Sequence, residues 1–79
     1  MNIKIYNLSQ NIDDRALARL FHPYGVVNSA IVDRNSLNGR SRGNGMVEMP
    51  IHSEAMQAIV SLHQTTVDGK QISVSEWMA

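Results

Sequence analysis

The stretch Gly39-Arg40-Ser41-Arg42-Gly43-Asn44-Gly45-Met46-Val47-Glu48-Met49 decides the fold of this chain. Its first half combines glycines, a serine and two arginines, which favours a flexible, cationic loop over residues 33–42. In its second half Met46, Val47 and Met49 lie among polar neighbours up to Pro50, which predicts a strand over residues 43–49. A basic loop that leads onto a sheet is a common arrangement for meeting a polyanion.

The composition limits the chain to one small domain. Its 79 residues leave no room for a second core, and a hydrophobic fraction of 43% is sufficient for one. Because the chain has no cysteine, disulfide scaffolds, cysteine zinc sites and thiol catalysis are excluded. The sequence has no apolar run of membrane-spanning length and no signal-peptide pattern, so we expect a cytoplasmic protein.

The charges are balanced overall but uneven along the chain. Seven basic residues offset seven acidic ones, which argues against a non-specific, charge-driven binder of nucleic acid. Three of the basic residues, Arg34, Arg40 and Arg42, fall within nine positions around the loop. The sequence therefore predicts a neutral domain with one basic lobe.

The first segment of the chain predicts a strand over residues 3–8. Its period-two alternation places Ile3 and Ile5 inward and Lys4 and Tyr6 outward. A helix is predicted to follow, because its apolar residues recur at helical spacing: Leu17, Leu20, Phe21 and Tyr24.

The predicted helix has clear start and stop signals. Asp13 is expected to cap its N-terminus, and Pro23 and Gly25 to end it. The β-branched run over residues 26–32 predicts a second strand. Its inward residues are Val27, Ala30 and Val32, a spacing that requires a local irregularity between the first two.

The closing half predicts a helix from about residue 52 to residue 63. Its apolar face consists of Ala55, Ala58, Ile59 and Leu62. Residues 67–70 contain an Asp-Gly turn signal, residues 72–75 alternate as a final strand, and residues 76–79 form a tail that contains Trp77. The order strand, helix, strand, strand, helix, strand predicts an α+β, ferredoxin-like split βαβ fold. Its four-stranded antiparallel sheet carries both helices on one face, and the other face stays open.

The chain resembles the RNA recognition motif (RRM) family. On the longer ribonucleoprotein motif K/R-G-F/Y-G/A-F-V-x-F/Y, Arg42, Gly43, Gly45 and Val47 match in register. Residues 3–8 are similar to the family's shorter motif. The resemblance implies a single RRM domain over residues 1–79, with a core at 2–76 and a tail at 77–79, similar to short stand-alone bacterial RRM proteins.

The resemblance also shows what this chain lacks. The three family positions that carry base-stacking rings are Lys4, Asn44 and Met46 here. Base–aromatic stacking contributes about 1–3 kcal/mol per base, and a micromolar complex has only about 8 kcal/mol in total. The family's usual stacking mode therefore cannot support tight binding in this chain.

Eight residues remain as predicted RNA contacts: Lys4, Tyr6, Arg40, Arg42, Asn44, Met46, Ser75 and Trp77. Arginine pairs with phosphate and stacks on bases, asparagine bonds base edges, and methionine offers an adaptable apolar contact. The competing explanations are solvated surface charges, turn chemistry at Asn44, and a Trp77 that packs as a lid or against a partner chain.

These observations favour a single-stranded RNA-binding module of modest affinity, with single-stranded DNA as an alternative ligand. The alternative function is a protein-interaction domain, including a homodimer, that uses the ring-poor face of the sheet. No catalytic residue, metal site or cofactor is predicted, because His22, His52 and His63 are not at metal-ligand spacing. The glycines of residues 39–45 do not join a strand to a helix, as a phosphate-binding loop requires.

Overall fold

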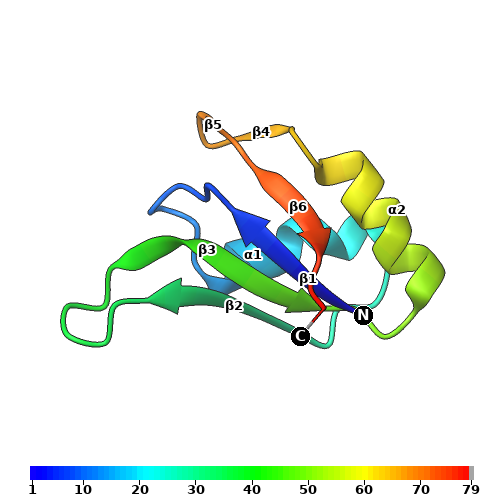
Figure 1. The fold of residues 1–79 in the computed structure, drawn as a ribbon, viewed down its shortest axis with the longest axis horizontal. Helices are drawn as coiled ribbons and strands as arrows, with labels where there is room; N and C mark the ends of the chain where they lie inside the picture. Colours follow the sequence, from blue (N-terminus) through cyan, green and yellow to red (C-terminus); the bar gives the residue numbers. More distant parts are fainter. Residues whose placement is uncertain (79) are drawn as a thin grey trace.

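A computed structural model describes residues 1–78. Figure 1 shows the sheet in front, with α1 behind it and α2 beside β6. The elements, in chain order, are β1 (Asn2–Tyr6), α1 (Asp14–Phe21), the 3₁₀ turn η1 (His22–Tyr24), β2 (Ser29–Arg34), β3 (Ser41–Glu48), α2 (His52–Leu62), β4 (Thr66–Val67), β5 (Lys70–Gln71) and β6 (Ser73–Glu76).

The four long strands form one antiparallel sheet in the order β2-β3-β1-β6. The first and third strands in the chain therefore lie at its centre, and the split βαβ fold is confirmed. Ile3 and Ile5 of β1 are fully buried, whereas Tyr6 is exposed, as the alternation predicts. The inner face packs on both helices, and the core that results consists of Ile3, Ile5, Leu8, Leu17, Phe21, Val32, Val47, Met49, Ala55, Ala58, Leu62, Ile72 and Val74.

The start of α1 follows its capping chemistry. The Asp13 carboxylate accepts a hydrogen bond from the Ala16 backbone N–H at 2.8 Å, so the predicted N-cap is confirmed. The prediction that Pro23 ends the helix is wrong in detail. The α-helix ends at Phe21 and tightens into η1, where Pro23 lies near the start, a position at which its missing N–H is tolerated.

The predicted second strand begins too early. The Val26 N–H donates to the Glu54 carboxylate of α2 at 3.0 Å, whereas the Asn28 N–H already donates to the Glu48 carbonyl of β3 at 2.9 Å. The regular strand β2 begins at Ser29. Val27 and Ala30 both pack against the core, as predicted, and a further irregularity that was not predicted lies between Val32 and Arg34.

The predicted loop over residues 33–42 is too long. The β2–β3 connection comprises only residues 35–40, because Arg34 pairs with Ser41. Between this pair and the pair of Val32 with Gly45, β3 has more residues than β2, and Gly43 absorbs the bulge with φ of +82°. The polar composition favours a loop, yet these residues can belong to strands because most of their side chains are exposed to solvent.

The closing half agrees with its prediction except for one added element. The predicted second helix is confirmed as α2. The Asp-Gly signal joins β4 and β5 as a hairpin, and Asp68 and Gly69 both have positive φ, as such a turn requires. The final strand runs over Ser73–Glu76, one residue later than predicted. Among residues 1–78, no helix combines the length and apolar character that crossing a bilayer requires.

Candidate functional site: the open face of the sheet

Sheet register brings most of the predicted contact residues together. Lys4 on β1 lies between Met46 of β3 and Ser75 of β6, and Tyr6 lies beside Asn44 of β3. Because these positions alternate with the buried ones, their side chains share the face that neither helix covers. We call this surface the open face.

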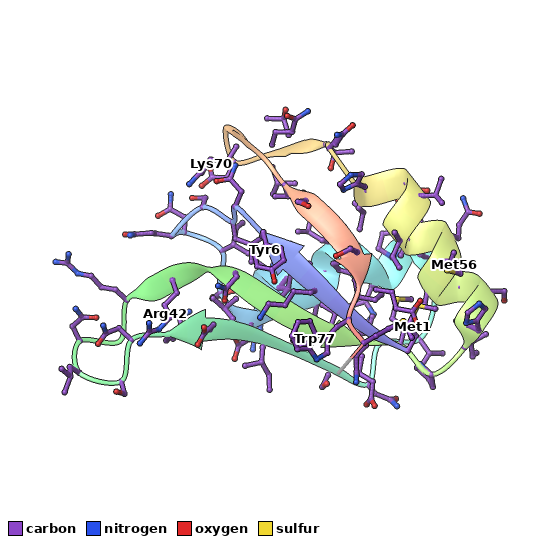
Figure 2. All side chains as sticks on the ribbon, viewed as in Figure 1. Met1, Tyr6, Arg42, Met56, Lys70 and Trp77 are labelled. Atoms are coloured by element: carbon purple, nitrogen blue, oxygen red, sulfur yellow. The ribbon has the colours of Figure 1, made fainter. Side chains whose placement is uncertain are left out.

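Trp77 extends the open face beyond the last strand. Its backbone N–H donates to the Asn2 carbonyl at 2.8 Å, which continues the pairing of β6 with β1. The Lys4 Nζ atom lies 5.7 Å from the centroids of both the Tyr6 and the Trp77 rings, within the range of a cation–π contact. Figure 2 shows both rings in front of the sheet. Two aromatic side chains therefore flank the lysine.

The β2–β3 connection is an ordered turn rather than the open loop that its composition suggests. The Asn35 backbone exchanges hydrogen bonds with Gly39 and Arg40, each at 2.8 Å. The Asn35 side-chain oxygen accepts from the N–H groups of Leu37 and Asn38, as in an Asx turn. These bonds hold the basic segment beside the end of the open face.

The two arginines among the predicted contacts differ in their surroundings. Arg42 lies on β3 and faces Asp33, with 3.9 Å between Nε and the carboxylate oxygen; both side chains are about half exposed. At this exposure an ion pair contributes little, so a phosphate can compete for the guanidinium. Arg40 lies exposed in the connection itself. The structure therefore places Arg42 at the border of the open face and Arg40 outside it.

Asn44 has an unusual environment. Its side-chain oxygen is buried and has no hydrogen-bond partner among the described residues. A buried acceptor without a donor costs about 1–3 kcal/mol. Asn44 is thus not a satisfied turn residue, although it lies next to the Gly43 bulge.

The alternation also implies one open-face residue that the predicted contacts omit. Ile31 of β2 pairs with Met46 and is 60% exposed. Its neighbours Ala30 and Val32 were expected to point inward, so Ile31 had to point outward. Ile31 and Met46 give the β2–β3 side of the open face an apolar character.

Both edges of the sheet are held by side chains that sequence reasoning missed. The Asp14 carboxylate accepts from the Val32 N–H at 2.7 Å on the outer edge of β2. On the outer edge of β6, the His63 Nδ1 atom accepts from the Val74 N–H at 3.0 Å. No local pattern reveals such contacts, because each joins segments that are distant in sequence. One backbone N–H on each edge is therefore unavailable to an added strand.

A third cluster stabilises the loops at the end of β1. The Ser9 hydroxyl and the Asn11 amide both donate to the Asp68 carboxylate. These hydrogen bonds, that from Ser9 foremost, lower the pKa of Asp68 below its ordinary value. They link the β1–α1 loop to the β4–β5 turn, and so the cluster is structural.

Comparison with known proteins identifies the family. The sequence pattern of the RNA recognition motif matches residues 3–73, nearly the whole chain. The chain belongs to the RNA recognition motif family. The RRM resemblance drawn from residues 3–8 and 42–49 is therefore confirmed.

Curated relatives of this RRM domain are longer proteins. It is 40% identical over 77 residues to Glycine-rich RNA-binding protein 1 of Mycosarcoma maydis, covering 95% of this chain and 44% of that protein. It is 47% identical over 72 residues to the chloroplastic 29 kDa ribonucleoprotein of Arabidopsis thaliana, covering 89% of this chain and 20% of that protein. The RRM domain thus spans less than half of either relative.

Solved structures agree with the fold of this RRM domain. The crystal structure of RNA binding protein PG1 matches with a TM-score of 0.96 and 37% identity, over 100% of this chain and 95% of that one. A structure of the Sxl-lethal protein/RNA complex matches with a TM-score of 0.94 and 29% identity, over 99% of this chain and 47% of that one.

Proposed function

We propose that this RRM domain binds single-stranded RNA with modest affinity through its open face and its basic β2–β3 connection. The observation that supports this most directly is the open face itself. Lys4, Tyr6 and Trp77 form a mixed cationic and aromatic surface that neither helix covers. Such surfaces suit bases that have been separated from a duplex.

Each predicted contact residue has a role in this proposal. Arg40 and Arg42 hold the phosphate backbone, and Lys4 adds a third cation. Tyr6 and Trp77 offer rings, Met46 and Ile31 an apolar surface, and Asn44 and Ser75 polar groups for base edges. The family and the names of its relatives, several of which are RNA-binding proteins or ribonucleoproteins, support RNA as the ligand.

The proposal is of binding without catalysis. The residues on the open face recognise phosphates and bases, and none of them is paired with a nucleophile or a general base. A cytoplasmic location and the capacity to bind single-stranded DNA stay predictions. Comparison of an RNA octamer with its DNA counterpart tests the second, because only RNA offers a 2′-hydroxyl.

The test is a titration of a labelled random RNA octamer at about 50 and 200 mM salt. We expect affinity to fall with salt, and the slope to become shallower by roughly 0.7–1.4 when Arg40 and Arg42 are both replaced by alanine, because each phosphate contact on a single strand contributes about 0.7. The matched control replaces Arg15 and Arg19 of α1, which are also exposed but lie on the helix side of the sheet. This control removes the same charge and should leave the slope almost unchanged.

Two results would overturn the proposal. Absence of RNA binding at the lower salt concentration, together with a dimer in sedimentation, would assign the open face to a protein partner. Equal slopes for the two double-arginine variants would mean that the β2–β3 connection does not hold the RNA backbone.

A further inference from the structure

The aromatic surface of this domain consists of two rings on the open face, Tyr6 and Trp77. Tyr6 and Trp77 are 44% and 43% exposed, and the Lys4 Nζ atom lies 5.7 Å from each ring centroid. Tyr6 lies on β1, and the chain that follows β6 crosses the open face, so that the Trp77 ring lies in front of the β3 side of the sheet (Figure 2). The backbone of Trp77 is held by its hydrogen bond to Asn2, and both rings lie beside the Lys4 ammonium group. Two exposed rings therefore share one cation before any ligand arrives.

The two motif positions on β3 carry no aromatic ring. The two β3 positions at which the family motif has rings carry Asn44 and Met46, and both are half-buried. The Asn44 oxygen is covered and has no donor, and a methionine presents no planar surface to a base. Stacking on these two β3 positions is therefore not available to this chain.

We propose that the base-stacking platform has moved from the two β3 motif positions to Tyr6 and Trp77, each of which stacks on one base of a single strand. This inference rests on the proposed RNA-binding function. In the free protein Lys4 lies between the two rings and takes the place of a ligand. On binding, its flexible side chain leaves the rings and meets the phosphates that connect the two stacked nucleotides.

The two kinds of contact have different signatures. A ring is uncharged, so its loss lowers affinity at every salt concentration by the same factor, about 5- to 160-fold for one stacked base. Lys4 releases counterions when it meets a phosphate, so its loss makes the salt slope shallower by about 0.7. A lysine that stayed between the rings would leave the slope unchanged.

Trp77 is the only tryptophan in the chain, so its fluorescence reports on the site directly. The experiment titrates the full chain with a random RNA octamer, at two salt concentrations, and follows both emission and affinity. The variants are Trp77→Leu, Tyr6→Leu and Lys4→Met, which keep apolar bulk. The matched control is Met56→Leu on α2, where a methionine that is 40% exposed lies away from the open face. Thermal unfolding verifies that each variant folds, which we expect because the three side chains lie outside the buried core.

The proposal expects quenched emission, a 5- to 160-fold loss of affinity for each ring variant with no change of slope, and a change below about threefold for Met56→Leu. Three outcomes would overturn it while RNA binding stands. The first is unmoved emission with wild-type affinity in Trp77→Leu, the second is tighter binding in that variant, which would make Trp77 a lid, and the third is a Met56→Leu loss as large as those of the ring variants. If the wild-type chain binds no RNA at the lower salt, the proposed function fails first and this inference fails with it.

Discussion

Gly45 offers a strict test of how α1 packs on the sheet. A Cβ atom added there would lie 2.8 Å from Leu17 Cδ2, 3.0 Å from the Ile31 carbonyl oxygen and 3.3 Å from Leu8 Cδ1. Leu8 and Leu17 are completely or almost completely buried, and the third atom belongs to the backbone of a paired strand. None of the three can move into free space. We predict that Gly45→Ala destabilises the domain.

The magnitude follows from two opposing effects. Overpacking of a filled core costs about 1–3 kcal/mol. Replacement of a glycine inside a strand regains about 0.5–1 kcal/mol, because Gly45 does not need a left-handed backbone. The net loss is about 1 kcal/mol, which for a domain of this size lowers Tm by roughly 4–8 °C. The family motif accepts alanine here, so the effect would be due to Leu17 in this particular core.

Thermal and urea unfolding measure the loss, and a double-mutant cycle assigns its cause. Leu17→Ala removes the Cδ2 methyl and by itself costs about 2–5 kcal/mol. In that background we expect Gly45→Ala to cost at least about 0.5 kcal/mol less than in the parent, because the closest contact is gone. Strict additivity, or a Gly45→Ala protein as stable as the parent, would refute the packing argument.

Three further predictions concern the hydrogen bonds that join distant segments. Because its pKa is lowered, Asp68 stabilises the fold above the ordinary carboxyl pKa of about 4, and this stabilisation is lost as the pH falls through the lowered value. The urea midpoint of Asp68→Asn should therefore decrease less than that of the parent below about pH 4. An equal decrease in both proteins contradicts this. Asp14→Ala should cost about 0.5–1.5 kcal/mol by leaving the Val32 N–H without its acceptor, and Asp14→Asn, which keeps an oxygen, should cost less in the same unfolding assay. His63→Leu should speed hydrogen exchange at the Val74 amide, and equal protection in both proteins would mean that the histidine does not hold this edge.

The sequence predicts the fold well because each element has an apolar period that tertiary contacts do not override. The alternation in β1 and the spacing in α2 each give the correct buried side. The errors lie at boundaries. Glu54 captures the Val26 N–H and delays β2, and a bulge at Gly43 lets β2 and β3 continue into a polar segment. Both depend on contacts between segments that a local pattern does not contain.

In the candidate site, too, local sequence pattern predicts some features, and contacts between distant segments determine the others. Alternation places Lys4, Tyr6 and Trp77 on one face without any structure, and it implies Ile31 as well. It does not reveal that Lys4 lies between the two rings, because that depends on how β6 and the residue after it pair with β1. The roles of Asp14 and His63 at the sheet edges were hidden for the same reason.

The energetics of the open face link its rings to its arginines. Two stacked bases contribute roughly 2–6 kcal/mol, which falls short of the about 8 kcal/mol that a micromolar complex needs. The remainder has to come from contacts to phosphate, and Arg40, Arg42 and Lys4 are the cations placed for it. Binding should therefore depend strongly on salt even though the chain has no net charge, because the basic residues at one end of the sheet determine the local field. A neutral domain with two rings and a lysine on its open face, and two arginines at or beyond the border of that face, is suited to hold a short single strand reversibly.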